Sequence, residues 1–299
     1  MAIGDVRPVP SCTDVHYVDT GMYDVPAYGA VYVIPGPRPA VVDTGIGADR
    51  ERVLAALREA GVAPDELDAI LLTHVHLDHA GGAGYLAERA PDATVYVHER
   101  GARHLADPGR LVAGTKDAVG DMWTYYDEPK PVPVERITEL DDGDRVALGN
   151  RTLTAHHAPG HAPHQVVFHD DRDDAVFTGD AAGIWVPDRE TVAPTSPPPQ
   201  FDLEQCLADV EMIRNLDPET LLFAHFGPGP DDVAGVLDEY ERTLSAWVED
   251  VAAARAEADD DEAAIAALVE DAPFADVWGA EKARAEVRLN ARGALRALD

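Results

Sequence analysis

The sequence contains little cysteine and no long hydrophobic run. Cys12 and Cys206 are its only cysteines and lie far apart, so we expect neither a disulfide framework nor a cysteine metal cluster. Residues Met1–Pro10 lack a basic segment followed by an apolar run, and no stretch approaches the roughly 18 uninterrupted apolar residues of a membrane span. We therefore expect a cytoplasmic protein that is neither exported nor membrane-spanning.

Positive charge is also scarce. Lysine and arginine total 24 against 56 acidic residues, and the formal net charge is -32. Such a surface repels nucleic acid unless a basic patch or high salt intervenes. The acids are spread along the chain, which indicates a salt-adapted (halophilic) protein whose self-repulsion is screened, the alternative being an ordinary acidic protein.

Short apolar runs separated by turn residues predict strands along the first three quarters of the chain. They are Val15–Val18, Ala30–Ile34, Ala40–Val42, Ala69–Thr73, Thr94–Val97, Arg145–Leu148, Thr152–His156, Gln165–His169, Ala175–Thr178 and Leu221–Ala224. Helical spacing predicts helices at Asp49–Ala60, Gly81–Arg89, Glu99–Leu105 and Asp202–Leu216. The alternation of strands and helices, with 45% hydrophobic residues, indicates an α/β fold with a buried core.

Three segments depart from this pattern. Periodicity breaks down over Ala106–Pro133, which could be an active-site lid or a loop packed on the core. Pro187–Pro199 contains five prolines and is expected to be irregular. Residues 231–299 form a predicted helical extension, with helices at Val233–Ala256, Ala263–Val269 and Glu281–Leu298 and an acidic linker at Glu257–Glu262. This extension could cap a pocket or form a homodimer interface.

A cluster of candidate metal ligands follows the predicted strand that ends at Thr73. His74, His76, Asp78 and His79 place three imidazoles and a carboxylate in six positions, a pattern that chance would produce in roughly two of a thousand such sequences. Zinc, iron and manganese accept these groups. Other candidates also follow predicted strands, in Pro-Gly-His161, Thr-Gly-Asp180 and Ala-His225-Phe-Gly.

These motifs, in this order between Tyr28 and Gly227, resemble those of the metallo-β-lactamase superfamily, particularly its glyoxalase II-like and lactonase-like branches. The resemblance implies a four-layer αββα sandwich, with a catalytic domain over residues 1–230 and a helical extension over residues 231–299. It also implies two divalent metal ions, preferably zinc, with iron or manganese as alternatives. The first metal would be held by His74, His76 and His161, the second by Asp78, His79 and His225, with Asp180 bridging them. Asp43 resembles a family position that orients a ligand from behind; the alternative is a turn-forming residue.

Two such ions can activate a water as hydroxide and polarise the bond under attack. By resemblance, Asp78 would bind that water as well as a metal. His164 could contact the substrate or protonate the leaving group, and Trp185 could line the pocket; the alternatives are a strand-edge histidine and a packing tryptophan. No serine lies in a G-x-S-x-G elbow.

We expect a hydrolase acting on an ester, lactone or thioester of a small molecule. The segment Pro-Gly-His161-Ala-Pro-His164-Gln165 departs from the Pro-Gly-His-Thr-x-Gly-His of the thioesterase branch, which argues against a glutathione thioester in particular. One alternative is a phosphodiesterase of the RNase Z-like branch, although the acidic surface argues against nucleic acid. A second alternative is an iron-dependent persulfide dioxygenase.

Overall fold

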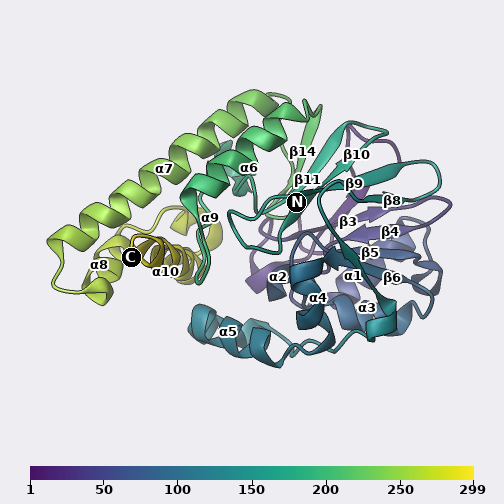
Figure 1. The fold of residues 1–299 in the computed structure, drawn as a ribbon, viewed down its shortest axis with the longest axis horizontal. Coiled ribbons are helices and arrows are strands. Elements are labelled where there is room, and N and C mark those ends of the chain that lie inside the picture. The colour runs from purple at the N-terminus through teal and green to yellow at the C-terminus, as the bar shows by residue number, and fades with distance from the viewer.

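A computed structural model describes residues 1–299 as two β-sheets packed face to face with helices on both outer sides (Figure 1). The first sheet has the order β1-β2-β3-β4-β5-β6-β7 and is antiparallel up to β4 and parallel from β4 to β7. Its strands are β1 Val6–Pro8, β2 His16–Asp19, β3 Ala30–Ile34, β4 Ala40–Val42, β5 Ala69–Leu71, β6 Thr94–His98 and β7 Ile137–Leu140.

The second sheet has the order β15-β14-β11-β10-β9-β8, in which only β11 and β14 are parallel. Its strands are β8 Arg145–Ala147, β9 Thr152–His157, β10 Val166–Asp170, β11 Ala175–Gly179, β14 Thr220–Phe223 and β15 Gly227–Pro228. A separate hairpin pairs β12 (Ile184–Val186) with β13 (Thr191–Ala193).

The helices cover the outer faces of the sheets. Those of the first half are α1 Arg50–Glu59, α2 Leu77–Ala80, α3 Ala83–Arg89, α4 Glu99–Ala106 and α5 Gly109–Val119. Those of the second half are α6 Leu203–Asn215, α7 Val233–Glu257, α8 Asp261–Glu270, α9 Ala275–Trp278 and α10 Ala280–Ala297. None is both long and apolar enough to cross a membrane.

Alternating side chains divide the core into layers. Tyr32 of β3 and Phe177 of β11 meet between the two sheets, with ring centroids 5.2 Å apart. Their strand neighbours point outward, so that Val33 packs with helices α1 and α3 while Val176 packs with α6 and α7. The expected αββα sandwich is therefore confirmed.

The C-terminal helices share a core with the second sheet. Val287 and Ala291 of α10 belong to the same buried cluster as Val176 of β11 and Val210 of α6. In Figure 1, α10 lies beside the long helix α7, with α8 at the far end of the lobe. The expected helices of residues 231–299 are thus present and are packed on the sandwich.

Two segments are more regular than expected. The segment 106–133 contains α5 and a 3-10 turn at Gly120–Tyr125, although we expected no periodicity there. Helix α5 has no buried residue, and Gly109 and Gly114 lower its helix propensity, so its helical signal in the sequence is weak. Pro187–Pro199 likewise includes β13, which pairs with β12 beside α7.

Candidate metal centre

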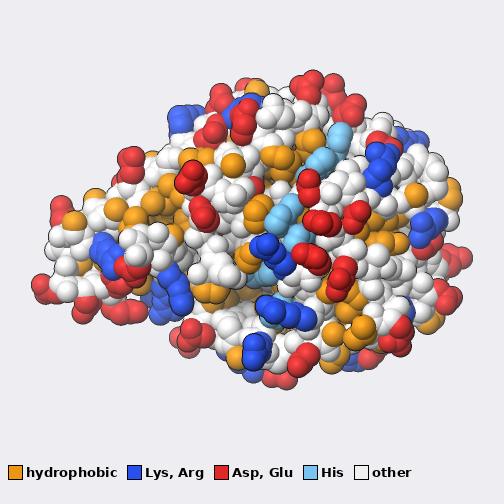
Figure 2. Space-filling model, viewed as in Figure 1, with side chains coloured by type: hydrophobic (Ala, Val, Ile, Leu, Met, Phe, Trp, Pro, Cys, Tyr) orange, Lys and Arg blue, Asp and Glu red, His pale blue; other side chains and the backbone are white.

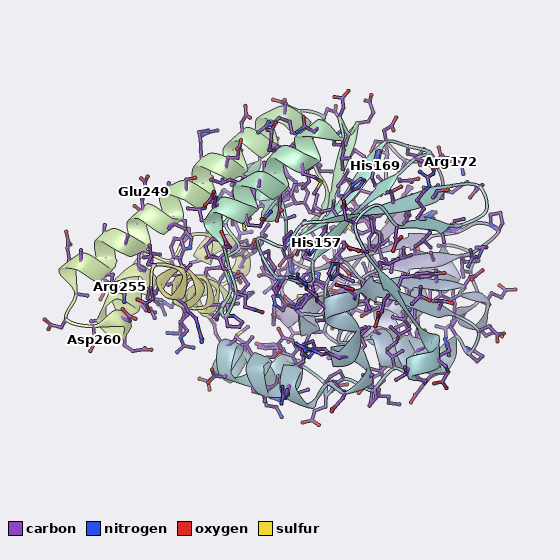
Figure 3. All side chains as sticks on the ribbon, in the orientation of Figure 1. His157, His169, Arg172, Glu249, Arg255 and Asp260 are labelled. Atoms are coloured by element: carbon purple, nitrogen blue, oxygen red, sulfur yellow. The ribbon has the colours of Figure 1, made fainter.

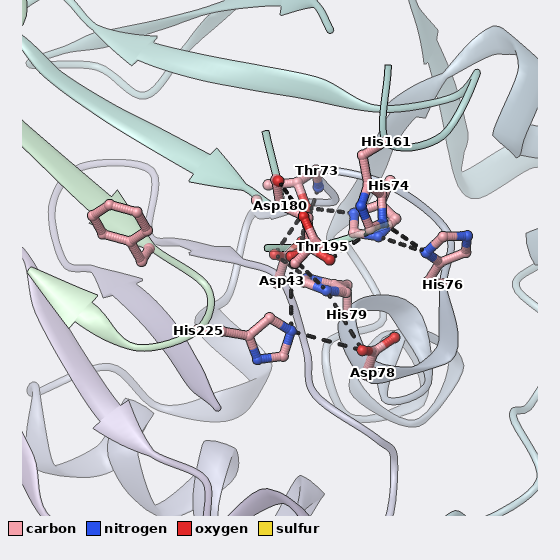
Figure 4. Close-up of polar contacts among 12 residues, drawn as sticks. Asp43, Thr73, His74, His76, Asp78, His79, His161, Asp180, Thr195 and His225 are labelled. Carbon is pink, nitrogen blue, oxygen red and sulfur yellow. Dashed lines mark hydrogen bonds and ion pairs between the residues drawn. The ribbon is translucent and has the colours of Figure 1, made fainter. Parts of the chain in front are cut away.

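Four loops bring the predicted ligands together at one end of the sandwich (Figure 4). Strand β5 is fully buried, and the segment Thr73–His79 follows it and leads into α2. His161 lies in the turn between β9 and β10, while Asp180 and His225 follow β11 and β14. Because β11 and β14 are parallel neighbours, the residues that follow them emerge at the same edge of the sheet.

The first group consists of three imidazoles. His74 Nε2 lies 3.0 Å from His76 Nδ1, and His161 Nε2 lies 3.1 Å from that same atom. His74 and His161 are buried and His76 is half-buried. Three ring nitrogens thus converge within reach of one small cation.

The second group consists of Asp78, His79 and His225. Asp78 Oδ2 lies 3.8 Å from His79 Nε2 and 3.7 Å from His225 Nε2. The backbone places Asp78 and His79 together in the first turn of α2, whereas His225 comes from the other sheet.

Asp180 lies between the two groups. Its Oδ2 is 3.2 Å from His161 Nε2 in the first group, and its Oδ1 is 3.3 Å from His79 Nε2 in the second. Oδ1 is also 3.7 Å from His225 Nε2. The two oxygens of one carboxylate therefore face different groups, which is the arrangement of a bridging ligand.

The donor set fits divalent metal. His79 Nε2 and Asp180 Oδ1 are buried without a hydrogen-bond partner, although buried polar atoms are normally satisfied. In a tetrahedral zinc site with bonds of about 2.0–2.1 Å, neighbouring ligand atoms are about 3.3 Å apart. The separations within both groups fall around that value, so the residues present can hold two ions.

Groups behind the imidazoles fix their orientation (Figure 4). Asp43 Oδ2 contacts His79 Nδ1 at 3.0 Å, and Asp43 Oδ1 accepts hydrogen bonds from the backbone N–H and the hydroxyl of Thr73. The carbonyl of Tyr28 lies 3.0 Å from His225 Nδ1. These contacts engage Nδ1 of His79 and of His225, and they leave the Nε2 lone pair of each ring directed at the ligand groups. The orienting role expected of Asp43 agrees with this geometry.

The electrostatics suit ligands of a cation. Burial lowers the pKa of His74 well below its ordinary value and that of His161 to about 3, so both rings are neutral. Burial opposes ionisation of Asp78 and Asp180, yet the charge of His79 holds the pKa of both carboxyls below its ordinary value. Burial opposes the charge of His79, but the carboxylates of Asp180 and Asp78 raise its pKa well above the ordinary value. Metal ligands are neutral imidazoles and ionised carboxylates, so His79 must release a proton when an ion binds, whereas His74 and His161 are already neutral.

A cavity of about 270 Å³ lies over the site. Figure 2 shows histidine side chains running toward the middle of this face among scattered acidic groups. The floor of the cavity includes His76, Asp78, His161, Asp180 and His225, and helices α5 and α10 form two of its walls. The segment 106–133 therefore reaches the pocket through α5.

The two further candidates differ in outcome. His164 lines the cavity, with its ring centroid 5.4 Å from that of His76 and its Nδ1 buried without a partner. Trp185 instead stacks on Phe223 within the core and does not line the cavity. The packing interpretation of Trp185 is the correct one, because β12 directs this side chain toward α7.

Several cavity residues were not predicted from the sequence. Tyr23 and Tyr28 precede every metal motif, Tyr126 lies in the 106–133 segment, and Lys282 and Glu286 are on α10. The aromatic cluster around Tyr126 was visible in the sequence, but no spacing links it to residues so distant in the chain.

The profile of the metallo-beta-lactamase superfamily matches residues 25–225. The chain belongs to this superfamily. The metallo-beta-lactamase fold-containing protein ST1585 from Sulfurisphaera tokodaii is 28% identical over 224 residues, covering 72% of this chain and 79% of that protein. The ST1585 crystal structure matches with a TM-score of 0.73 and 23% identity over 95% of this chain and 99% of that chain.

Two other proteins are similar to part of this chain. An acyl-coenzyme A thioesterase of Gallus gallus, MBLAC2, is 28% identical over 191 residues, which are 57% of this chain and 64% of that protein. The match thus spans less than two thirds of the thioesterase. A structure of the chemotaxis sensor ODP with a peroxy diiron species matches at a TM-score of 0.58 and 17% identity, covering 79% of this chain and 94% of that chain.

Proposed function

We propose that the protein is a dinuclear metal-dependent hydrolase that cleaves an ester, lactone or thioester of a small molecule. The observation that carries the proposal is the position of Asp180, whose two carboxylate oxygens face separate groups of ligands on the floor of a cavity. His74, His76 and His161 would hold one ion and Asp78, His79 and His225 the other. Zinc is the metal we favour for this histidine-rich set.

Two bound ions would lower the pKa of a water molecule and polarise the substrate bond. Among the protein groups, Asp78 is suited to accept a hydrogen bond from that water, because its side chain keeps 25% exposure at the cavity floor. His164 is suited to contact the leaving group, because it lines the cavity beside His76 with an unsatisfied Nδ1.

The cavity favours a small substrate. Its volume of about 270 Å³ is lined by Leu77, Leu111, Val119 and Leu289, which provide apolar contacts for an acyl chain. The buried cation of the wall, Lys282, is already paired with Glu286. A thioesterase among the relatives supports acyl chemistry in general. We further propose a cytoplasmic location, consistent with two free cysteines.

Two alternatives use the same ligands. Two metals also suit in-line attack on a phosphodiester. Histidine and carboxylate ligands also accept iron, so an iron-dependent persulfide dioxygenase is the second alternative.

The test compares substrates on protein loaded with zinc, iron or manganese. Wild-type protein is assayed with lactones, thioesters, aryl esters, bis-p-nitrophenyl phosphate, RNA and glutathione persulfide, the last by oxygen uptake. We expect acyl turnover, lost on Asp180→Asn and retained on His169→Gln. His169 is a matched control because it lies on β10 near Arg172, outside the ligand groups (Figure 3).

Phosphodiester cleavage that Asp78→Ala abolishes, with no acyl substrate cleaved, would overturn the proposal in favour of the first alternative. Oxygen uptake with the persulfide in the iron-loaded protein alone would favour the second.

A further inference from the structure

Two tyrosines in the cavity wall share a hydrogen bond. The hydroxyls of Tyr23 and Tyr126 are bonded to each other, and both residues line the cavity. Tyr23 comes from the turn after β2 and Tyr126 from the segment after α5, so they meet across 103 positions of sequence. Each residue is only 8% exposed. We call them the phenol pair.

One of the two hydroxyl protons of the phenol pair is not used in the hydrogen bond between Tyr23 and Tyr126. Two hydroxyls carry two protons, and the bond between them uses one. Neither hydroxyl makes any other hydrogen bond, whereas the neighbouring Tyr28 donates its proton to Glu286 Oε2 at 2.8 Å. Buried tyrosine hydroxyls usually find a partner. The remaining proton can be donated to a molecule in the cavity.

Lys282 lies beside one member of the phenol pair and favours that member as the donor. Its Nζ lies 4.5 Å from the centre of the Tyr23 ring and is held there by Glu286. A positive charge beside the Tyr23 ring favours its hydroxyl, rather than that of Tyr126, as the donor within the pair. Either hydroxyl can donate within the pair. With Tyr23 as the donor, Tyr126 accepts, and a hydroxyl that accepts a hydrogen bond becomes a better donor itself.

The phenol pair lies on the side of the cavity that carries the second group of ligands. Tyr23 and Tyr126 pack in one buried cluster with Leu77, the residue before Asp78. The ring centroids of Tyr23 and Tyr28 are 5.6 Å apart, and those of Tyr28 and His225 are 5.1 Å apart. A substrate held over Asp78 and His225 is thus bordered by the phenol pair.

We propose that Tyr126 donates a hydrogen bond to the acyl oxygen on which negative charge develops, with Tyr23 as the residue that positions and strengthens this donor. The inference rests on the proposed acyl hydrolysis. It narrows that function to substrates whose reacting oxygen faces the phenol pair. A donor placed where charge develops stabilises the transition state more than the ground state.

The test measures equilibrium binding of methylphosphonate, a tetrahedral anion that resembles the charged intermediate of acyl hydrolysis. Calorimetry with zinc-loaded protein compares wild type, Tyr126→Phe, Tyr23→Phe and the double variant. We expect Tyr126→Phe to weaken binding on the order of 10- to 100-fold, as for a hydrogen bond to a charged group. Tyr23→Phe alone should weaken it about 3-fold, because Tyr126 keeps its own proton.

In the Tyr126→Phe background, Tyr23→Phe should add nothing, because its effect passes through Tyr126. Loss of stability alone would not produce this coupling. Tyr125→Phe is the matched control, since Tyr125 also packs on the Tyr23 ring but does not line the cavity. It should bind like wild type. Metal content and thermal midpoint are measured for every variant.

Wild-type affinity in Tyr126→Phe, or no binding to wild type at all, would overturn the inference. Equal effects of Tyr23→Phe in both backgrounds would overturn the role of Tyr23. The binding test requires no turnover. If Tyr126→Phe loses affinity for methylphosphonate while the wild type cleaves no acyl substrate, the proposed hydrolase function is wrong but the donor role of Tyr126 in anion binding stands. If the wild type cleaves an acyl substrate, and turnover and binding are both unchanged in Tyr126→Phe and Tyr23→Phe, the role of the phenol pair is wrong but the hydrolase function stands.

Discussion

Asp43 holds a left-handed backbone conformation, with φ at 61°, directly behind His79. Asparagine and aspartate tolerate this conformation better than other non-glycine residues. The residue thus combines a permitted turn geometry with a carboxylate that contacts both His79 and Thr73. One short side chain links the end of β5 to the second group of ligands.

Asp43→Asn should weaken zinc binding roughly 10- to 100-fold, because the His79 ring loses a charged acceptor for its other N–H. The measurement is competition against a chromophoric chelator. Asp24→Asn is the matched control, because Asp24 also has a positive φ of 58° but is exposed and outside the site. Equal zinc affinity in Asp43→Asn and wild type would contradict the orienting role.

Asp209 gives a pH-dependent prediction. It lies buried in α6 and accepts hydrogen bonds from the backbone N–H of Gly160 and from Gln205, and burial raises its pKa to about 6. The unfolded chain, with the ordinary lower pKa, releases this proton first. The native state therefore binds more protons between about pH 4 and 6, and this contribution to stability is lost as pH rises through that window.

We accordingly expect the free energy of unfolding of wild type, relative to Asp209→Asn, to fall between pH 4 and 6 and to level off above. Urea unfolding of both proteins across this range provides the measurement. A difference that is independent of pH would show that Asp209 titrates normally.

At the scale of elements, the strands that were predicted best are the fully buried ones. Ala30–Ile34 and Ala40–Val42 were predicted to the residue, because continuous apolar runs bounded by turn residues identify buried strands. The edge strand β7 was missed, since three of its four residues are not buried and its pattern is polar. Helix α5 was missed because none of its residues is buried and two glycines weaken its helical signal.

Helix α10 can be tested at its closest approach to the rest of the molecule. A Cβ atom on Gly293 would lie 1.9 Å from the carbonyl oxygen of Ser196. Gly293→Ala should therefore force α10 away from that loop and destabilise the protein by about 1–3 kcal/mol, as other overpacked sites do. Gly114→Ala in α5 is the control, because nothing lies within 4 Å of its added Cβ.

Gly114→Ala should instead stabilise the protein by roughly 0.5–1 kcal/mol through helix propensity. Urea unfolding measures both variants. Gly293→Ala with wild-type stability would mean that α10 can shift at no cost.

At the scale of the molecule, the ligand clusters and the cavity walls differ in how far the sequence could predict them. The Thr73–His79 cluster was recognisable because its ligands are local. The assignment of His161, Asp180 and His225 to the same site required a family resemblance, because no spacing in the sequence shows that the ends of separate strands meet. The phenol pair and Lys282 were not predicted, since only tertiary packing brings the turn after β2, the segment after α5 and helix α10 to one cavity.

Tyr28 connects the ligand groups with the C-terminal lobe. Its carbonyl contacts His225, and its hydroxyl donates to Glu286 of α10. Zinc loading should therefore slow amide hydrogen exchange in α10 as well as around His225, whereas α1, which has no such contact, should change little. Exchange followed by mass spectrometry with and without zinc measures this. Protection confined to the ligand loops would contradict the connection.

The burial of Lys282 between two tyrosine rings has a practical consequence for the intact protein. The only other lysines, Lys116 and Lys130, keep 42% and 41% of their side chains exposed. An amine-reactive dye would therefore label Lys116 and Lys130 first. It would label Lys282 only when the rings of Tyr23 and Tyr28 move away from it. Because the chain has only three lysines, the rate at which Lys282 is labelled would measure how often these rings move apart.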